Sequence, residues 1–531
     1  MRTILTAMSP LEEAERRRTF AIISHPDAGK TTLTEKLLLY SGFLTAGAGS
    51  VKAKQGRRSA TSDWMDMEQQ RGISITSTVV QFPYDGKVMN LLDTPGHRDF
   101  SEDTFRVLAA ADAAIMVLDA AKGIEPQTRK LFEVCRDREI PIVTFINKWD
   151  RPGLDALELL DEIEEVLVLE PAPVTWPVGY AGNFKGVIDR RSGDFVRYTR
   201  TDRGATVAPE EVVPSRIAAS EEGEDWDAAT DGIELLDAVG RSFDNERFVS
   251  GYQTPVYFGS ALTNFGVRMM LEGLADVVPS PGPRVDVEGK PRPLDAPFSG
   301  LVFKVQANMD KAHRDRIAFL RVCSGRFERG MVVTHGPTGK PFATKYAHSV
   351  QGQERQTVDE AFPGDVVGLV NANDFRVGDA VFLDEPVAWP EIPTFAPNHF
   401  RLARVADTSR SKQFRSGIAQ LDEEGVVQVL RRAGVGDLEP ILGAVGPLQF
   451  EVASHRLENE FGAPVVLRPT SFTLARRTNA ESADFLKGRR SAEVVERRDG
   501  ELLALFDSSY ALAALERDFP ELLLEKLVAE G

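Results

Sequence analysis

The sequence predicts an α/β fold in which a doubly wound, mostly parallel sheet is followed by a β-barrel domain and by an α+β domain of the split βαβ type. Three observations predict it. Short apolar runs alternate with helical patterns up to about residue 280, and the apolar period then changes to two. After about residue 396, two helical patterns lie among four short strand-like runs. A chain of 531 residues is also too long for one hydrophobic core.

The first domain is expected to span residues 1–280. Its apolar runs have the length of buried parallel strands, and each is bounded by a helical pattern or a turn. The expected strands cover residues 20–23, 88–92, 113–118, 142–146 and 255–258, and the expected helices lie near residues 30–40, 101–111, 125–138, 154–168 and 266–278.

Two segments interrupt this alternation. Residues 42–71 are rich in Gly, Ser and Lys and lack periodicity, which is typical of a functional lid or a disordered loop. Residues 179–250 are predicted to be an insertion, with a hairpin over 186–196 and acidic helix and loop over 207–247.

Two proline-rich segments mark the later boundaries. The sequence Pro279-Ser280-Pro281-Gly282-Pro283 is typical of a linker, and the alternating pattern after it predicts a β-barrel over residues 281–396. An α+β third domain is expected over residues 397–531. Its strands are expected at residues 400–405, 426–430, 441–444 and 465–467, its helices at 411–421 and 447–461, and at least one more strand pair and an amphipathic helix after residue 470.

Composition excludes several classes of protein. The first 18 residues are polar, no stretch approaches the roughly 20 apolar residues that span a bilayer, and there are two cysteines. We therefore expect a cytoplasmic protein with no membrane contact, no disulfide framework and no zinc site. The net charge is −17, of which residues 210–247 supply 12 acidic against 3 basic residues. Residues 401–415 reverse the sign, with five basic residues against Asp407, and could contact RNA phosphates or form a solvated helix face.

A phosphate-binding loop is predicted between the first strand and the helix that follows it. The usual form is G-x-x-x-x-G-K-[ST], and Ser24 stands at the first glycine position. Gly29 lets the backbone approach a phosphate, Lys30 can reach the β- and γ-phosphates, and Thr31 can ligate Mg²⁺. A G-K-T before a helix also occurs by chance, so the other motifs decide. The nucleotide-binding residues predicted here are Ser24, His25, Pro26, Asp27, Ala28, Gly29, Lys30, Thr31 and Thr32.

A second motif, Asp93-Thr94-Pro95-Gly96-His97, directly follows an apolar run. A carboxylate at the end of a strand beside a phosphate loop is where Mg²⁺ needs a ligand, directly or through water. The Gly96 amide can sense a γ-phosphate. Alone, this sequence is an ordinary turn; after a strand and a phosphate loop, it favours a nucleotide site.

The base is expected to be read by Asn147-Lys148-Trp149-Asp150, again at the end of a strand. Asp150 can accept hydrogen bonds from the N1–H and N2–H₂ donors of guanine, which adenine lacks. Asn147 would brace the phosphate loop or the base, and the Lys148 stem would cover the ring. A strand-to-helix turn with an Asp cap is the alternative. After the last strand, Gly259-Ser260-Ala261 could donate to guanine O6, with Ser260 and Ala261 as the candidates.

Arg71-Gly72-Ile73-Ser74 ends the long loop. A hydroxyl there could complete the Mg²⁺ shell only when a γ-phosphate is present, which would give an order–disorder switch. Ser74 and Thr76 are both candidates, and a solvated loop is the alternative.

Together these segments resemble the five nucleotide-site motifs of translational GTPases, at residues 24–31, 71–74, 93–97, 147–150 and 259–261. The resemblance implies a P-loop GTPase domain that binds GTP, GDP and Mg²⁺, with Thr31, Ser74 and Asp93 as metal ligands. It also implies that His97 positions the attacking water once ribosomal RNA of the large subunit engages it, and that His97 and Lys30 are the catalytic residues. Ser74 stands where most relatives have Thr.

Within this family the sequence is most similar to members that act in termination, over nearly the whole chain. Residues 23–32, 68–76, 258–267 and 443–450 carry this likeness, and residues after 470 match least clearly. It implies a monomeric GTP hydrolase that binds the ribosome after peptide release and promotes dissociation of the codon-specific release factor.

Three other functions remain open from the sequence. A translocase like elongation factor G would need two further domains, for which no chain remains. A P-loop phosphotransferase acting on a small molecule would need an acceptor pocket, and residues 147–150 argue for guanine. A GTP-loaded scaffold that never hydrolyses has no need of His97.

Overall fold

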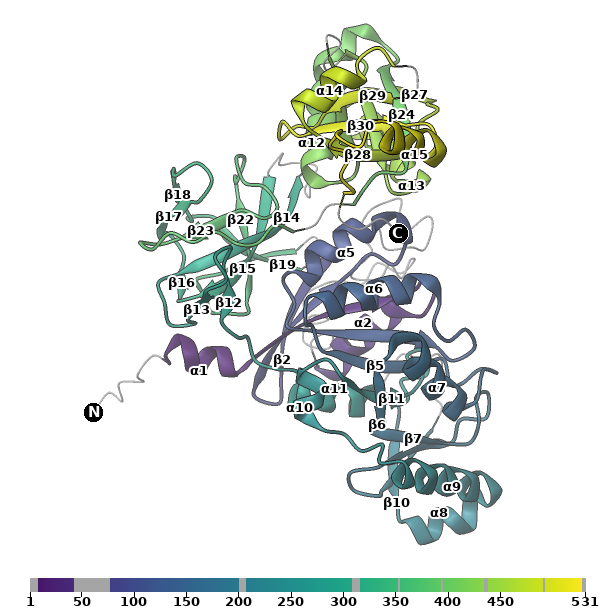
Figure 1. Ribbon diagram of the computed structural model, residues 1–531. Coiled ribbons are helices and arrows are strands. Elements are labelled where there is room, and N and C mark those ends of the chain that lie inside the picture. The colour runs from purple at the N-terminus through teal and green to yellow at the C-terminus, as the bar shows by residue number, and fades with distance from the viewer. Residues whose placement is uncertain are drawn as a thin grey trace, which may run out of the picture.

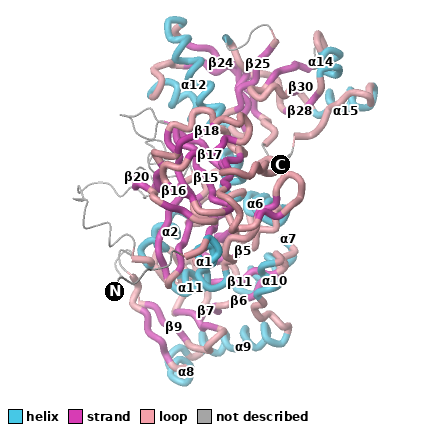
Figure 2. Tube along the Cα trace, turned by 90° about the vertical axis from the view of Figure 1, so that its left-hand side faces the viewer, coloured by secondary structure: helices cyan, strands magenta, loops and turns pink. Residues whose placement is uncertain are grey.

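A computed structural model of the chain describes residues 8–42, 77–199, 207–307, 316–351, 354–392, 395–433, 438–489 and 492–527. The first domain lies at one end of the molecule and the third at the other, with the β domain beside the two (Figure 1). The view turned by 90° keeps this order (Figure 2). Within those ranges, no helix has both the length and the apolar character needed to cross a membrane.

The first domain is built on a seven-stranded sheet of order β2-β3-β1-β4-β5-β11-β6. All its pairs are parallel except β2 with β3. The strands are β1 Arg17–Ser24, β2 Thr78–Tyr84, β3 Lys87–Asp93, β4 Ala113–Asp119, β5 Ile142–Asn147, β6 Glu170–Pro173 and β11 Gln253–Phe258. Parallel strands join through crossovers, here mostly helical. The helices are α1 Pro10–Glu15, α2 Lys30–Tyr40, η1 Arg98–Phe100, α5 Ser101–Leu108, α6 Pro126–Asp137, α7 Ala156–Leu167, α10 Asn245–Val249 and α11 Val267–Val277.

Helices cover both faces of this sheet. Leu131 of α6 and Ile163 of α7 belong to the core on one face. Leu33 of α2 and Leu271 of α11 belong to the core on the other. Because both faces are buried, β4 is buried at all its positions, which explains its continuous apolar run. The predicted doubly wound sheet is confirmed, and it brings the carboxyl ends of its parallel strands to one edge.

The insertion forms a separate antiparallel sheet of order β10-β9-β8-β7, with two helices against it. Its elements are β7 Thr175–Val178, β8 Gly186–Asp189, β9 Phe195–Tyr198, β10 Glu210–Val213, α8 Ser215–Glu222 and α9 Glu224–Ala238. The hairpin predicted around residues 186–196 is confirmed by the pairing of β8 with β9. The insertion lies at the end of the molecule farthest from the third domain (Figure 1).

Three strands in this part of the chain were not predicted: β6 of the main sheet, and β7 and β10 of the insertion. The sequence indicated only helix and loop over residues 207–247, but β10 pairs with β9 and buries Val213. Strand β10 is stabilised by its pairing with β9, which the sequence pattern of residues 210–213 alone does not reveal. Strand β6 contains Pro171 and Pro173. A sheet tolerates proline at an edge, and β6 is an edge strand.

The β domain is antiparallel throughout, and its main sheet has the order β18-β17-β23-β14-β15-β22-β19-β20. Its core contains Val302, Leu320 and Val367, which alternate with residues on the other face as the period of two predicted. The strands are β12 Arg284–Val285, β13 Pro291–Arg292, β14 Ser299–Ala307, β15 Arg316–Ser324, β16 Phe327–Glu328, β17 Val332–His335, β18 Pro341–Ala343, β19 Ala347–Gln351, β20 Glu354–Thr357, β21 Glu360–Ala361, β22 Val366–Val370 and β23 Ala380–Phe382.

The third domain has one seven-stranded sheet of order β27-β24-β26-β25-β29-β30-β28. Its first half follows the predicted order of strand, helix, two strands, helix and strand. The elements of that half are β24 His399–Val405, η3 Thr408–Arg410, α12 Ser411–Glu424, β25 Gln428–Arg432, β26 Ile441–Ala444, α13 Pro447–Asn459 and β27 Val465–Pro469. The second half extends the same sheet through β25 and β29. It contains β28 Leu474–Thr478, α14 Ala480–Leu486, β29 Ala492–Glu496, β30 Leu502–Phe506 and α15 Ser509–Asp518.

The β domain is held to the first domain by buried ion pairs. Arg17 Nε donates to Asp365 Oδ2 at 2.8 Å, and Arg321 Nη2 donates to Asp112 Oδ1 at 2.7 Å. Arg17, Asp365 and Arg321 are buried. Breaking such a pair leaves an uncompensated charge in the interface, so the pairs favour one relative placement of the two domains.

Asp422 on α12 makes the stability of the third domain depend on pH. Its Oδ1 accepts a hydrogen bond from the Val429 amide at 2.8 Å, but burial raises the pKa of the carboxyl from 3.8 to about 6. The folded protein therefore holds this proton more tightly than the unfolded chain does. The contribution to stability is complete below pH 4 and is lost as the pH rises through 6.

We expect Asp422→Asn to raise the Tm at pH 7.5, by an amount equivalent to at most about 3 kcal/mol, and to leave it unchanged near pH 4. The amide oxygen still accepts from Val429 but carries no charge. Thermal melts of both proteins at the two pH values check this. A Tm difference that is the same at both values would contradict it.

Candidate functional site

The loop between β1 and α2 has the backbone of an anion-binding site. Asp27 has φ 67° and Gly29 has φ 100°, which turns the chain sharply before α2 begins at Lys30. Left-handed residues in such a loop let successive amides point to one side, and the N-terminus of α2 adds its own amides. A Cβ at position 29 would lie 2.3 Å from Asn147 Nδ2. Both φ and the close approach therefore require glycine here.

The motif after β3 lies against this loop. Lys30 Nζ donates to Asp93 Oδ1 at 2.8 Å, and both side chains are buried. Thr94 Oγ1 donates to the carbonyl of Ile22 at 2.5 Å, which attaches the turn to β1. A Cβ on Gly96 would be 3.8 Å from Lys30 Cε. The structure thus brings a cation, a carboxylate and a glycine amide together at one edge of the sheet.

Asn147 connects this site to two further loops. Its Nδ2 donates to the carbonyl of Ala28 at 2.7 Å, and its Oδ1 accepts from the Ala261 amide at 2.8 Å. One buried amide therefore joins the phosphate loop to the loop after β11, where Ser260 is fully buried. The third and fourth predicted segments lie together because β5 and β11 are neighbours in the sheet.

Lys148 and Asp119 form the next pair along this edge. Lys148 has φ 65°, and its Nζ donates to Asp119 Oδ2 at 2.8 Å. Burial acts to raise the pKa of Asp119, but hydrogen bonds from Lys148 and the Ala121 amide outweigh it, so the pKa is lowered. The sequence reading missed Asp119. Its signal was present, because Asp119 ends an apolar strand as Asp93 and Asn147 do.

Asp150 carries the most direct indication of a ligand. Its Oδ1 is buried and has no hydrogen-bond partner within the described part of the chain. A buried carboxylate oxygen without a donor is costly, on the order of 1–3 kcal/mol or more. The N1–H and N2–H₂ edge of guanine supplies donors of the required kind. Trp149 is almost fully buried and its amide donates to the Gly259 carbonyl at 3.1 Å, which anchors Asp150.

His25 differs from the other residues of the phosphate loop. Its ring is buried, and Nδ1 lies 2.5 Å from Glu125 Oε2 at the start of α6. Burial lowers the pKa of His25, against the opposing effect of Glu125. The ring therefore braces the loop, and the backbone of His25 is the part available to a phosphate. Glu125 was not predicted.

His97 stands at the open side of the site. Its side chain is 30% exposed, and its Nδ1 accepts a hydrogen bond from the Asp99 amide at 3.2 Å. The Asp99 carboxylate oxygen Oδ1 lies 3.4 Å from the same nitrogen, so the main chain and the side chain of Asp99 both hold this side of the ring. The partial exposure leaves the ring accessible to water and to a partner molecule.

The residues predicted to hold Mg²⁺ are only partly visible. Thr31 lies in the first turn of α2 and Asp93 ends β3, beside Lys30. Ser74 and Thr76 lie outside the described residues, as does most of the long loop before them. In the described ranges, no group of three or more His, Cys, Asp or Glu could hold a metal unaided. The oxygen donors present fit Mg²⁺, which is held in nucleotide sites by one or two protein ligands, phosphates and water.

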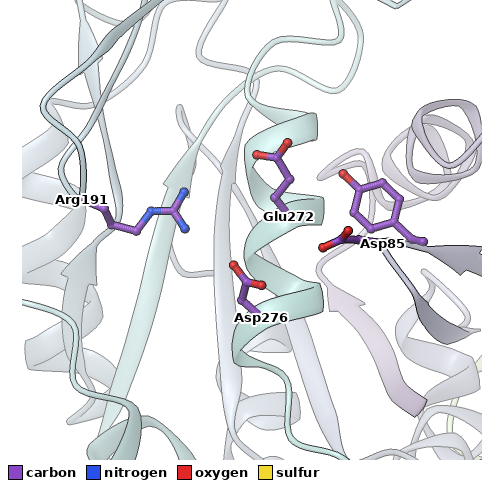
Figure 3. Close-up of a pocket in the computed structure, with 5 residues that line it drawn as sticks. Asp85, Arg191, Glu272 and Asp276 are labelled. Atoms are coloured by element: carbon purple, nitrogen blue, oxygen red, sulfur yellow. The ribbon is translucent and has the colours of Figure 1, made fainter. Parts of the chain in front are cut away.

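An open pocket lies away from this edge. It is lined by Tyr84, Asp85, Arg191, Glu272 and Asp276, with both acidic residues of α11 facing it (Figure 3). Asp85 lies in the turn between β2 and β3, at the opposite edge of the sheet from Asp93. Three carboxylates would repel a nucleotide, so this pocket does not belong to the site.

Comparison with known proteins shows a relationship over nearly the whole chain. Residues 15–280 match the family described as elongation factor Tu GTP binding domain, residues 297–383 match elongation factor G domain 2, and residues 389–516 match class II release factor RF3, C-terminal domain. A protein of Gloeobacter violaceus named peptide chain release factor 3 is 50% identical over 96% of this chain and 97% of its own length. A Synechocystis protein of the same name is 52% identical over 88% of this chain and 86% of its own.

One solved structure shows the same fold. A crystal structure of a protein from Thermus thermophilus has a TM-score of 0.68 and 24% sequence identity. The match covers 87% of this chain and 68% of that one. At this level of identity the likeness concerns the fold.

Proposed function

The chain belongs to the peptide chain release factor 3 family of translational GTPases, and from this premise we propose that it is a ribosome-stimulated GTP hydrolase that promotes dissociation and recycling of codon-specific release factors after peptide release. The proposal rests mainly on the presence of two kinds of domain in one chain. A GTP-binding domain over residues 15–280 and a class II release factor domain over residues 389–516 occur in one chain.

The residues proposed to bind the nucleotide lie in or next to the loops at the carboxyl ends of the parallel strands. Residues 24–32 hold the phosphates through backbone amides and Lys30, and Gly96 senses the γ-phosphate. Asp150 reads the guanine N1 and N2 edge, Asn147 braces the loops around it, and the remaining base contacts come from Lys148, Ser260 and Ala261. The orphaned Oδ1 of Asp150 supports this assignment.

Hydrolysis requires a positioned water and stabilisation of charge. Water attacks the γ-phosphorus, and the bond from that phosphorus to the β–γ bridging oxygen breaks, releasing GDP and phosphate. His97 orients the water, and Lys30 stabilises the charge on the phosphate oxygens. Thr31, Ser74 and Asp93 (the last directly or through water) would hold Mg²⁺, which would supply neutralisation of the charge on the phosphates. The ribosome, through rRNA of its large subunit, would bring His97 to its working position.

The division into domains is part of the proposal. The domains are residues 1–280 with the insertion at about 179–250, residues 281–396 and residues 397–531. The matched ranges 15–280 and 297–383 support the first two, and the third match, 389–516, begins eight residues before the proposed boundary. Basic side chains on the third domain offer contacts to RNA phosphates, and Arg404, Arg410, Lys412 and Arg415 are exposed. We place the protein in the cytoplasm, where it acts as a monomer on ribosomes.

Ejection of a release factor needs a coupling between two binding events. The ribosome state that accepts the GTP-bound arrangement must bind the codon-specific factor less well, because otherwise no differential free energy drives it off. A tenfold acceleration requires only about 1.4 kcal/mol. A rearranged contact between domains can supply this amount.

The test follows a fluorescently labelled release factor on ribosomes whose peptide has been released. We expect this protein with GTP to accelerate departure of the factor at least tenfold over GDP or over no addition. Movement of transfer RNA by one codon is measured in parallel. Unchanged departure with faster movement would indicate a translocase, and no effect on either would leave only a GTPase.

A further inference from the structure

Helix α13 of the third domain begins without a capping side chain of its own. Its N-cap residue is Gly446, followed by Pro447. Gln449 Oε1 accepts from the amides of Val445 at 2.7 Å and Gly446 at 3.2 Å, which is one half of a capping box. The other half would be an N-cap side chain that accepts from the first-turn amides, and glycine cannot provide it.

Asp99 of the first domain supplies the missing group. Its Oδ2 accepts a hydrogen bond from the Leu448 amide at 2.8 Å, across the domain boundary. Leu448 is at the second helical position, whose amide an N-cap side chain serves. A carboxylate at the positive end of a helix is also electrostatically favourable. Asp99 therefore acts as the N-cap side chain for an amide that lies 349 residues away in the sequence.

The fit at this contact is close. Asp99 is 2% exposed, and a Cβ on Gly446 would lie 2.0 Å from its Cγ. Phe100, the next residue, is buried in a small cluster with Leu448 and Val452 of α13. Only glycine at position 446 leaves room for the carboxylate. Because Asp99 and Leu448 belong to different domains, the cap forms only when these domains are docked.

The main chain of Asp99 holds the predicted catalytic histidine. Its amide donates to His97 Nδ1 at 3.2 Å. Its carboxylate oxygen Oδ1 also lies 3.4 Å from the same nitrogen. Asp99 therefore contacts His97 through its amide and Oδ1, and contacts α13 through Oδ2. Any displacement of the third domain that withdraws the Leu448 amide removes an anchor from the residue that holds the imidazole.

A second contact fixes the orientation of the same segment. Arg106 of α5 donates from Nη1 to the carbonyl of Glu424, the last residue of α12, at 3.0 Å. A Cβ on Gly425 would lie 1.9 Å from that Nη1. A guanidinium at the negative end of one helix and a carboxylate at the positive end of another match the two dipoles. The contacts of Arg106 with the end of α12 and of Asp99 with the start of α13 together fix how η1 and α5 lie against the third domain.

We propose that Asp99 is a positioning residue for hydrolysis, which transmits docking of the third domain to His97 by capping α13 with its carboxylate and holding Nδ1 with its amide. This inference rests on the proposed role of His97 in ribosome-stimulated hydrolysis. The third domain thereby becomes part of the apparatus that sets the catalytic geometry.

The decisive comparison is between Asp99→Ala and the double variant Asp99→Ala/Gly446→Ser. In the double variant the introduced serine hydroxyl caps α13 locally, since the N-cap has extended φ −152° and ψ 162° and the Asp99 carboxylate no longer fills the space. The helix end is repaired, but neither the docking contact nor the carboxylate contact with His97 is restored. We expect ribosome-stimulated kcat to fall on the order of 10- to 100-fold in both variants, with the Kd for GTP unchanged.

Gly446→Ala separates the two contacts, because it keeps the Asp99 carboxylate but fills its space at α13. It should lower kcat as well, and an unchanged kcat in Gly446→Ala would overturn the inference.

Hydrogen exchange provides the independent readout. Protection of the Leu448 amide should be lost in Asp99→Ala and restored in the double variant, while kcat stays low. Asp99→Asn should keep kcat within about threefold of wild type, because an amide oxygen caps a helix nearly as well as a carboxylate. Asp155→Ala is the matched control, since it removes a carboxylate N-cap from α7, a helix that lies within the first domain. It should not change kcat.

Recovery of kcat in the double variant would show that Asp99 merely stabilises α13, and would overturn the inference. If ribosomes stimulate Asp99→Ala to the same kcat as wild type, the inference would be overturned as well. A wild type that ribosomes do not stimulate would instead overturn the proposed function, and this inference with it.

Discussion

Replacing His97 by alanine is expected to abolish ribosome-stimulated GTP hydrolysis while the affinity for GTP changes by less than about threefold. Activation of related switches accelerates phosphoryl transfer on the order of 10³–10⁵-fold, chiefly by positioning groups and stabilising charge. Loss of the group that orients the water should remove most of that factor. GTP binding should persist, because the nucleotide contacts proposed for Lys30, Asn147 and Asp150 do not involve His97.

The geometry explains why the effect should be confined to the stimulated rate. His97 is partly exposed, and its Nδ1 is occupied by the Asp99 amide. In the proposed mechanism, Nε2 is then the ring nitrogen that remains for the attacking water. Without the ribosome, little of the acceleration depends on this ring.

Single-turnover hydrolysis with saturating ribosomes checks this, beside equilibrium binding of a fluorescent GTP analogue. His97→Gln is a useful companion, because it keeps a hydrogen-bonding group but cannot be protonated. Stimulated turnover in His97→Ala equal to that of wild type would remove His97 from the mechanism.

Asp150→Asn is expected to change the base that the protein prefers from guanine to xanthine. In the proposed contact, the aspartate accepts from N1–H and N2–H₂ of guanine, whereas an asparagine amide would accept from N1–H of xanthine and donate to its O2. Sites built on buried hydrogen bonds reject the unmatched partner by about 10²–10⁵-fold. We therefore expect GTP affinity to fall at least about 100-fold and xanthosine triphosphate to bind more tightly than GTP.

The structure makes this test specific. Asp150 Oδ1 is buried and lacks a donor among the described residues, while Asp155, five residues later, is an N-cap of α7 whose Oδ1 accepts from the Leu157 amide at 2.9 Å. Asparagine caps a helix about as well as aspartate. Asp155→Asn therefore controls for the loss of one nearby charge and should leave nucleotide preference unchanged.

Competition binding with GTP and xanthosine triphosphate against a labelled guanine nucleotide measures both quantities. If Asp150→Asn binds GTP as tightly as wild type does, Asp150 does not read the base. A loss of both nucleotides would point to damage to the loop, which the Asp155→Asn protein and its Tm would help to identify.

The local sequence pattern was sufficient to predict that the motifs at the ends of strands lie together. The positions of Asp93 and Asn147 after apolar runs predicted their convergence, because parallel strands bring their carboxyl ends to one edge of a sheet. Asp119 obeys the same rule at the end of β4. It was overlooked because it has no motif around it, although an inventory of polar residues at strand ends would have found it.

The pairing of strands far apart in the sequence could not be predicted from the local sequence pattern. Strand β10 exists because β9 offers it a partner, and β6 tolerates two prolines because it lies at an edge. Neither property is visible in a short window of sequence. The sequence predicted at least one more strand pair after residue 470, and the structure confirms this with β28, β29 and β30. Only the structure shows that these strands join the sheet of the first half through β25 and β29.

The doubly wound sheet, the order of the three domains and the nucleotide-site motifs could all be predicted from the sequence, since they follow from periodicity and from residues close together in the chain. Packing of the domains alone decided that Asp99 caps α13 and that Arg106 meets the end of α12. The reason is physical. A helix terminus needs a hydrogen-bond partner but does not specify where in the chain that partner lies, so the choice is made when the domains pack.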